Sequence, residues 1–179
     1  MKHMNVTPMI ESAAIQHRVQ ELATQIAADY GERSLVMVGI LTGAARFMMD
    51  LMTALPEAVS DRVDYDFIGA ASYDGHESTG QVDITLETAV ELRGRHILVV
   101  DGIADTGLTM QRVLRYMEDQ SPQSVKTCVL LDKPSRRRHA IGLDYTGFEI
   151  EDVFVVGYGL DADQCGRSLR YIGVADEDY

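Results

Sequence analysis

The sequence is short of the residues that mark several common classes of protein. Its 179 residues include no tryptophan, two cysteines and four prolines, and 16 basic residues are outnumbered by 28 acidic ones. The net charge of −12 argues against a general nucleic-acid or anionic-membrane surface, because both need a positive field. No apolar stretch is long enough to span a bilayer, and the first residues lack a signal-peptide core, which predicts a cytoplasmic protein. Cys128 lies in an apolar run and its distance from Cys165 fits no metal or redox motif, which predicts a buried thiol and leaves a disulfide open.

What remains is the composition of an ordinary globular protein, with 46% hydrophobic and 25% charged residues. The length allows a full core, so residues 1–179 are expected to form one domain. Apolar spacing predicts a helix that begins at Thr7-Pro8 and ends at Gly31, and another from Phe47 to Leu55. Alternating strands and helices then predict an α/β fold with a mostly parallel sheet. Strands are expected at residues 35–40, 63–67, 82–86, 97–100, 125–131, 148–150, 153–158 and 171–174.

The segment from Ile97 to Met110 carries the clearest functional signal. Four apolar residues predict a buried strand, and Asp101, the turn Asp105-Thr106-Gly107 and a helical pattern follow. A turn that enters a helix presents unpaired N–H groups in one direction, and Gly107 lets the backbone approach a ligand closely. Because ligands bind at the carboxyl ends of strands in open α/β sheets, this pattern favours a phosphate-binding cradle over a simple helix cap. Neither G-x-G-x-x-G nor a Walker loop occurs in the sequence.

The same segment resembles the ribose-phosphate motif of the type I phosphoribosyltransferases, and other segments resemble the hypoxanthine branch of that family. The resemblance implies the type I phosphoribosyltransferase fold, with a small hood beside the central sheet. It also implies an Mg²⁺-dependent enzyme of purine salvage that converts hypoxanthine, or guanine, and 5-phosphoribosyl diphosphate to the nucleotide and pyrophosphate. It further implies a homodimer or homotetramer. The matching segments are Ile40-Leu41-Thr42-Gly43-Ala44, Ser72-Tyr73 with Ser78-Thr79-Gly80, Leu130-Leu131-Asp132-Lys133-Pro134, Gly147-Phe148-Glu149-Ile150 and Phe154-Val155-Val156-Gly157-Tyr158-Gly159-Leu160-Asp161.

In the cradle, the resemblance gives Asp105 the role of general base near N7 of the purine. Asp105, Thr106, Gly107, Leu108 and Thr109 are expected to anchor the 5-phosphate, largely through backbone N–H groups. A carboxylate suits this position chemically, because a base that faces the imidazole ring must accept a proton within hydrogen-bond reach. A helix-capping role for Asp105 is the alternative, and it is compatible with the first.

The ribose and the pyrophosphate are assigned to two further segments. Asp101 is expected to face the ribose hydroxyls or a metal-bound water, but the second acid that the family usually has next to it is Gly102 here. That change either weakens diphosphate binding or leaves the contact to water and Mg²⁺. Leu41, Thr42 and Gly43 are expected to bind pyrophosphate through N–H groups, in a turn that carries a non-proline cis peptide in the family.

For the purine, the resemblance points to Lys133, whose ammonium offers only donors and so suits a 6-oxo group. Phe154 is expected to stack on the purine, and the backbone of Val155 to read its edge. Asp161 is expected to be a second Mg²⁺ ligand and Arg167 a cation for pyrophosphate. Each residue has a plainer alternative: a solvated lysine, a core phenylalanine and two surface charges.

Ser72 and Tyr73 resemble the start of a loop that closes over the reacting centre in the family. His76 in this loop is interpreted as an exposed histidine, and Arg136 to His139 as a solvated or subunit-facing turn. A different class of function is a diphosphate-sensing, RNA-binding regulator of the same fold, which the strongly negative total charge disfavours. A transferase that uses xanthine or a pyrimidine is a third alternative, disfavoured by Lys133 and Phe154.

Overall fold

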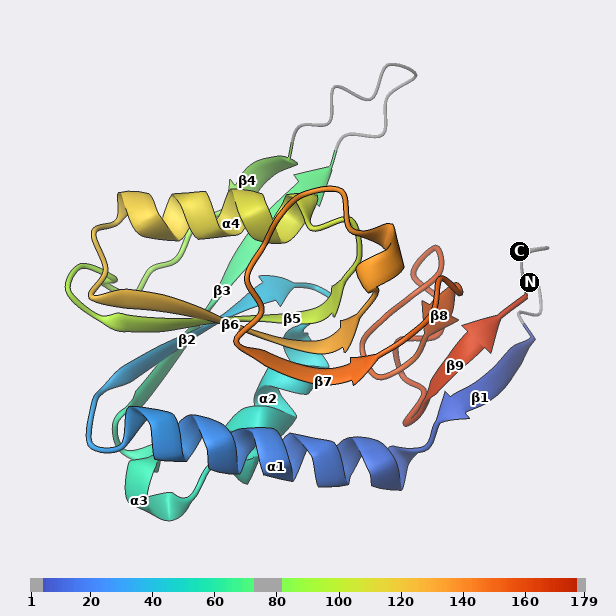
Figure 1. Ribbon diagram of the computed structural model, residues 1–179, viewed down its shortest axis with the longest axis horizontal. Helices are drawn as coiled ribbons and strands as arrows, with labels where there is room; N and C mark the ends of the chain where they lie inside the picture. Colours follow the sequence, from blue (N-terminus) through green and yellow to red (C-terminus); the bar gives the residue numbers. More distant parts are fainter. Residues whose placement is uncertain (1–4, 73–81, 177–179) are drawn as a thin grey trace.

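A central six-stranded sheet and a separate three-stranded hood organise the protein. The computed structural model describes residues 5–72 and 82–176. The central strands lie in the order β4-β3-β2-β5-β6-β7, and all neighbours are parallel except β3 and β4 (Figure 1). The predicted mostly parallel α/β fold is therefore confirmed. The strands are β2 (Leu35–Leu41), β3 (Val63–Ser72), β4 (Val82–Leu86), β5 (His96–Ala104), β6 (Ser124–Asp132) and β7 (Tyr145–Glu149).

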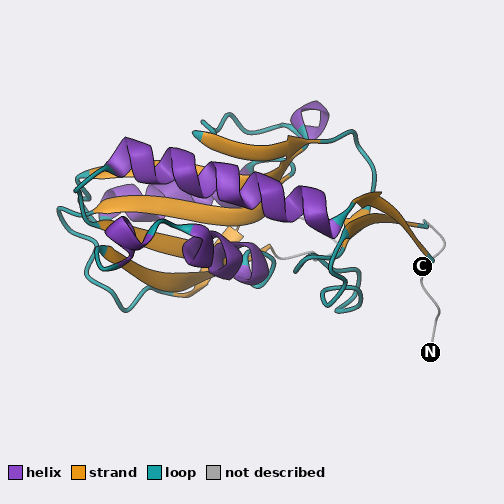
Figure 2. Cartoon of the chain, turned by 90° about the horizontal axis from the view of Figure 1, so that it is seen from below, coloured by secondary structure: helices purple, strands orange, loops and turns teal. Residues whose placement is uncertain are grey.

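Helices cover both faces of this sheet. On one face lie α1 (Ser12–Tyr30) and α2 (Ala45–Ala54), and on the other lies α4 (Leu108–Asp119). The short helix α3 (Glu57–Ser60) follows α2, and a single 3₁₀ turn, η1 (Pro134–Arg136), follows β6. In Figure 2 the long helix α1 crosses in front of the strands. No helix within the described ranges is long and apolar enough to cross a membrane.

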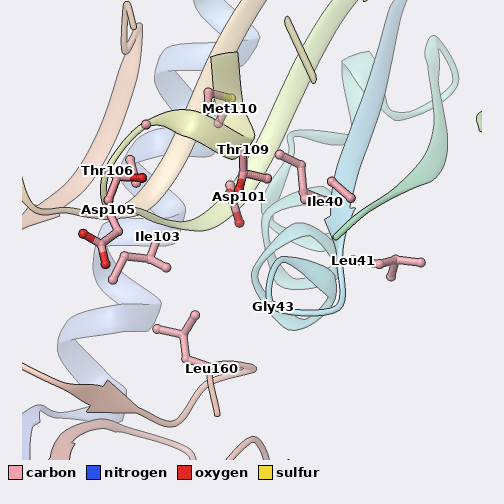
Figure 3. A pocket seen from close by; sticks show the side chains of 13 residues that line it. Ile40, Leu41, Gly43, Asp101, Ile103, Asp105, Thr106, Thr109, Met110 and Leu160 are labelled. Carbon is pink, nitrogen blue, oxygen red and sulfur yellow. The ribbon is translucent and has the colours of Figure 1, made fainter. Parts of the chain in front are cut away.

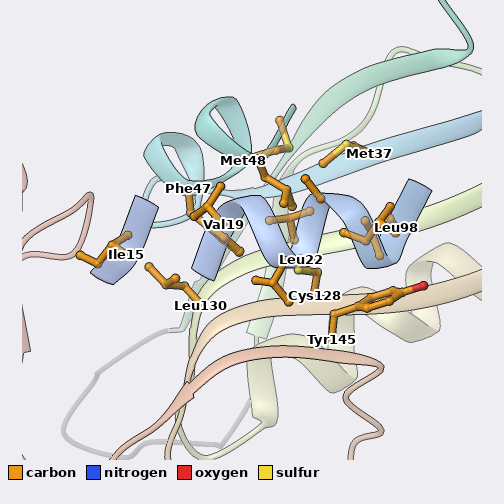
Figure 4. Packing of buried hydrophobic residues seen from close by; sticks show 14 of the residues in the cluster. Ile15, Val19, Leu22, Met37, Phe47, Met48, Leu98, Cys128, Leu130 and Tyr145 are labelled. Carbon is orange, nitrogen blue, oxygen red and sulfur yellow. The ribbon is translucent and has the colours of Figure 1, made fainter. Parts of the chain in front are cut away.

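The strands in the middle of the sheet are apolar on both faces because each face is covered. In β2, Met37 packs toward α1 and α2, whereas its neighbours Val36 and Val38 pack toward α4. Strand β5 alternates in the same way, with Leu98 on the first side and Val99 on the second. Figure 4 shows the first core, in which α1 and α2 meet the sheet. Its labelled members are Ile15, Val19, Leu22, Met37, Phe47, Met48, Leu98, Cys128, Leu130 and Tyr145.

The hood is an antiparallel sheet made from the two ends of the chain. It consists of β1 (Val6–Ile10), β9 (Ile172–Ala175) and β8 (Val155–Val156), with β9 in the middle. The prediction that a helix begins at Thr7-Pro8 is therefore wrong, since both residues lie in β1 and α1 begins at Ser12. A proline is tolerated here because β1 is an edge strand, where a missing N–H need not break the ladder.

Strand β5 is longer than the sequence pattern predicts. It continues to Ala104 because Ile103 and Ala104 still pair with Leu131 and Asp132 of β6. Asp101 therefore lies within the strand and not in the turn after it. Cys128 is buried, as predicted, and burial raises the pKa of its thiol.

A polar cluster fastens α1 to the beginning of β6 and β7. The hydroxyl of Tyr145 donates a hydrogen bond to Oδ2 of Asp29 at 2.6 Å, and Nζ of Lys126 donates to the same oxygen at 3.1 Å. Tyr145 is buried, and its ring also lies 5.3 Å from the Lys126 ammonium. The hydrogen bonds from Tyr145 and Lys126 hold the pKa of the Asp29 carboxyl below its ordinary value. This cluster lies at the end of the sheet opposite to the carboxyl ends of the strands.

Replacing Tyr145 by phenylalanine should lower the free energy of unfolding by about 0.5–1.5 kcal/mol, because one hydrogen bond to a carboxylate is lost while the ring is kept. Urea denaturation at neutral pH measures this difference. The matched control is Tyr65→Phe, since Tyr65 is exposed and no described residue is hydrogen-bonded to its hydroxyl. Because the folded-state pKa of Asp29 is lowered, the stabilisation is present at neutral pH and lost as the pH falls through that pKa. A difference that grows in acid would contradict this account.

Candidate active site

A cavity of about 250 Å³ opens at the carboxyl ends of β2 and β5. Figure 3 shows Asp105 and Thr106 on one side of it, the loop with Leu41 and Gly43 on the other, and Asp101 between them. This is the edge of an open α/β sheet at which ligands bind. The residues that line it are Ile40, Leu41, Gly43, Ala70, Asp101, Ile103, Ala104, Asp105, Thr106, Gly107, Thr109, Met110 and Leu160.

The predicted phosphate cradle is the turn between β5 and α4. Helix α4 begins directly after Gly107, which adopts a left-handed conformation with φ 87°. A Cβ at Gly107 would lie 2.7 Å from the carbonyl oxygen of His139, so both the conformation and the space require glycine. No backbone acceptor among the described residues bonds the N–H groups of Asp105, Thr106 or Gly107. The turn thus presents open donors beside the cavity.

On the opposite side, the loop after β2 contains a cis peptide bond between Leu41 and Thr42. Leu41 and Gly43 line the cavity, whereas Thr42 is exposed. The loop turns directly into α2, and the N–H of Ala44 donates to the carbonyl oxygen of Ile40 at 3.1 Å. A non-proline cis peptide in this turn agrees with the expectation from the sequence.

Asp101 is a partly buried carboxylate on the floor of the cavity. Its Oδ1 accepts a hydrogen bond from the N–H of Gly102 at 2.7 Å. Burial raises the pKa of this carboxyl to about 7, although hydrogen bonds from the backbone of Gly102 and Ile103 oppose the shift. A cation or a hydroxyl donor in the cavity would favour the ionised form, so the geometry suits a ligand that brings one.

The carboxylate of Asp105 is held by an arginine from the turn after β6. Nε of Arg136 lies 3.0 Å from Oδ1 of Asp105, and Nη1 of Arg136 lies 3.6 Å from Oδ2 of Asp152. Asp152 precedes Phe154 by two residues, so a single guanidinium joins the cradle to the segment before β8. This ion pair places Asp105 beside the cavity with one oxygen engaged.

The three predicted purine-site residues, Lys133, Phe154 and Val155, do not line the cavity. Lys133 follows β6 and is 5% exposed, and its N–H donates to the carbonyl oxygen of Ala104 at 3.0 Å. No described residue accepts a hydrogen bond from its ammonium. Phe154 is 51% exposed, while Val155 is buried in β8. The structure thus leaves the purine roles of Lys133, Phe154 and Val155 as predictions, since none of the three lines the cavity.

Asp161 and Arg167 are paired with each other in the hood. Nη2 of Arg167 lies 2.8 Å from Oδ1 of Asp161, and the N–H of Gln164 donates to Oδ2 of Asp161 at 2.8 Å. Nη1 of Arg167 donates to the carbonyl oxygen of Gly159 at 2.7 Å. Neither side chain lines the cavity, and the described part of the chain contains no group of three or more side chains that could hold a metal ion.

Comparison with known proteins identifies the family of this chain. The family model described as a phosphoribosyl transferase domain matches residues 9–163. The chain is 41% identical over 176 residues to the hypoxanthine phosphoribosyltransferase of Escherichia coli K12, covering 97% of this chain and 96% of that one. This chain belongs to the phosphoribosyltransferase family.

Other relatives lie in the hypoxanthine branch of the phosphoribosyltransferases. The hypoxanthine-guanine-xanthine phosphoribosyltransferase of Tritrichomonas foetus is 36% identical over 183 residues, with 97% of this chain and 98% of the relative covered. The crystal structure of a hypoxanthine-guanine phosphoribosyltransferase from Bacillus anthracis superposes with a TM-score of 0.88 at 32% identity, and covers 97% of this chain and 100% of that one. The resemblance inferred from the sequence is therefore confirmed, and so is the fold.

Sequence reasoning missed the apolar wall of this phosphoribosyltransferase site. Ile103 lies two residues after Asp101 on β5 and also lines the cavity, and a longer predicted β5 would have brought it to this edge of the sheet. Met110 and Leu160 also line the cavity, and nothing in the sequence marks them apart from their neighbours. Of the predicted closing loop, Ser72 ends β3, and Tyr73 and His76 lie outside the described residues.

The interpretation of residues 136–139 as a solvated or subunit-facing turn stays a prediction, but it did not include two ion pairs that the turn makes. Arg136 pairs with Asp105, and the partly buried Arg137 pairs with Asp132. Arg138 is exposed, as expected. The sequence could not predict the pair of Arg136 with Asp105, because Arg136 follows β6 and Asp105 follows β5, and only the parallel pairing of the two strands brings them to one edge.

Gly102 is a glycine because other atoms occupy the space of its side chain. Its φ is not in the left-handed region, but a Cβ there would lie 3.0 Å from the carbonyl oxygen of Gly43 and 3.0 Å from Cδ2 of Leu160. The loop after β2 and the hood therefore both pack against the bare backbone of β5. The space that the side chain of a second acid would take at Gly102 is therefore occupied by Gly43 and Leu160.

Gly102→Ala should lower the free energy of unfolding by about 1–3 kcal/mol through overpacking. It should also raise KM for the diphosphate, because relieving the contact displaces the Gly43 loop. The matched control is Gly142→Ala, where nothing lies within 4 Å of the added Cβ. Adding Leu160→Ala should recover part of the loss, as it removes one of the two contacts. A Gly102→Asp variant of unchanged stability and lower KM would instead revive the interpretation as a missing ligand.

Proposed function

We propose that this protein transfers the phosphoribosyl group of 5-phosphoribosyl diphosphate to hypoxanthine, with IMP and pyrophosphate as products. Guanine is the second proposed substrate and gives GMP. The observation that carries the proposal is the cavity, with an N–H-rich turn at Asp105–Thr109 facing the loop at Leu41–Gly43 across Asp101. A sugar with a phosphate at one end and a diphosphate at the other matches these two sets of donors. The names of the relatives from Escherichia coli and Tritrichomonas foetus support the same reaction.

In this reaction the bond from C1 of the ribose to the pyrophosphate oxygen breaks while the bond from C1 to N9 of the purine forms. Asp105 accepts the proton of N7 through the carboxylate oxygen that Arg136 leaves open. The N–H groups of the cradle hold the 5-phosphate, which fixes C1 relative to the purine. The backbone of Leu41–Gly43 takes up the charge that develops on the leaving pyrophosphate.

Mg²⁺, bound to the diphosphate, would neutralise part of the charge of the leaving group. Asp101 fits the role of a protein contact for this ion, because its carboxylate lines the cavity and a cation there would favour the ionised form that burial disfavours. Mg²⁺ is commonly held by one or two carboxylates together with substrate phosphates and water, so no larger protein ligand set is needed. Asp161 is the second proposed contact. Arg167 would then exchange its ion pair with Asp161 for pyrophosphate.

On the purine side, Lys133 is proposed to donate to the 6-oxo group and Phe154 to stack on the ring, with the backbone of Val155 at the edge. The low exposure of Lys133 supports this role, since a largely buried lysine whose ammonium has no acceptor among the described residues gains from a carbonyl ligand. The proposed setting is a cytoplasmic homodimer or homotetramer whose partners are small molecules, with no nucleic acid and no membrane. No observation favours the RNA-binding regulator.

Lys133→Ala should lower kcat/KM for hypoxanthine by about 100-fold or more, because a site built to pair a carbonyl discriminates strongly when its donor is lost. A spectrophotometric assay of the purified protein with each purine, 5-phosphoribosyl diphosphate and Mg²⁺ measures this. Lys126→Ala, at the other end of β6, is the control for loss of a lysine. Unchanged hypoxanthine kinetics in Lys133→Ala would remove the lysine from the site, and a wild-type protein inactive with every purine would refute the proposed reaction.

A further inference from the structure

The turn after β6 is hydrogen-bonded to the phosphate cradle and to the end of β5. We call residues 133–139 the arginine turn. The N–H of Lys133 donates to the carbonyl oxygen of Ala104 at 3.0 Å, and the N–H groups of Arg138 and His139 both donate to the carbonyl oxygen of Thr106 at 3.0 Å. The carbonyl groups of Ala104, at the end of β5, and of Thr106, in the cradle, are thus fixed so that they point at the arginine turn.

These hydrogen bonds fix the direction of the backbone N–H groups in the cradle. In a trans peptide the C=O of one residue and the N–H of the next are antiparallel. Since the carbonyls of Ala104 and Thr106 point back at the arginine turn, the N–H groups of Asp105 and Gly107 point the other way. Both residues line the cavity, and no described backbone acceptor takes these hydrogen atoms. The arginine turn therefore aims the donors that the proposed 5-phosphate needs.

Arg137 is the side chain at the centre of this contact. Its Nη2 pairs with Oδ1 of Asp132 at the end of β6 and lies 3.4 Å from the carbonyl oxygen of Ala104 at the end of β5. Its Nη1 is buried without a hydrogen-bond partner among the described residues, and lies 3.4 Å from the position that a Cβ would take at Gly107. A guanidinium thus lies directly behind the left-handed residue of the cradle.

We propose that Arg137 is a positioning residue for binding of the ribose 5-phosphate group, an inference that rests on the proposed function. It fixes the ends of β5 and β6 to each other and holds the Ala104 carbonyl away from the cavity. Its guanidinium also neutralises Asp132 behind Gly107, so that this carboxylate does not add to the repulsion of a phosphate by Asp101 and Asp105. Arg137 does not touch the ligand in this role. A lysine cannot replace it fully, because an ammonium does not span two acceptors with the planar fork of an arginine.

The test compares two ligands that occupy different parts of the site. Ribose 5-phosphate probes the cradle, and pyrophosphate with Mg²⁺ probes the loop at Leu41–Gly43. Isothermal titration calorimetry measures both dissociation constants for the wild type, Arg137→Lys, Arg137→Met and the neighbouring control Arg138→Met. The double variant Asp132→Asn with Arg137→Met removes both charges of the pair, so it remains informative where the single change leaves Asp132 unpaired and unfolds the protein. Thermal unfolding identifies the folded variants.

We expect the dissociation constant for ribose 5-phosphate to rise by about tenfold to a hundredfold in the folded Arg137 variants. That for pyrophosphate should stay at its wild-type value, and Arg138→Met should bind both ligands normally. Unchanged ribose 5-phosphate binding in the Arg137 variants would overturn the inference, and so would an equal loss for both ligands, which a merely structural role predicts. A wild-type protein that binds neither ligand would instead refute the proposed function.

Discussion

The parallel pairing of β5 with β2 on one side and β6 on the other is the constraint on which the rest of the site depends. Residues 35–39 of β2 and 96–104 of β5 run in register with their neighbours, so the loops after β2, β5 and β6 leave the sheet at the same edge. These loops bring the Gly43 turn, the cradle and the arginine turn together. Because both faces of β5 are buried under helices, the strand cannot shift by one residue without moving its apolar side chains to the wrong face.

A protein of net charge −12 that binds a polyanion must obtain its positive potential locally. Backbone N–H groups at the cradle and at the Gly43 loop supply part of it without any net charge. In the proposed site, basic side chains would supply the rest: Arg136 pairs with Asp105 and Arg137 with Asp132 at the cradle, and Arg167 pairs with Asp161. Each of these arginines is paired with an aspartate, so its positive charge is balanced within the protein.

The sequence predicted what is local and periodic, and failed where distant segments meet. The strand from Ile97, the turn at Asp105–Gly107 and the helix after it follow from patterns inside one segment, and all three are confirmed. Thr7-Pro8 satisfies the rules for a helix start, yet pairing with β9 overrides that preference, because the partner strand lies at the other end of the chain. The contacts of the arginine turn could not be predicted for the same reason. Its role is defined by carbonyl groups of Ala104 and Thr106, which no side-chain pattern encodes.

Gly102 is interpreted differently from the sequence and from the structure. As a sequence feature it is the loss of an acid. In the structure it lets the carbonyl oxygen of Gly43 approach β5, and the carbonyl also abuts Gly159, where a Cβ would lie 2.7 Å from it. The Gly43 loop is thus packed between the sheet and the hood, and Leu160 completes the wall. Asp101 is then the carboxylate that remains on the floor of the cavity, and burial raises its pKa.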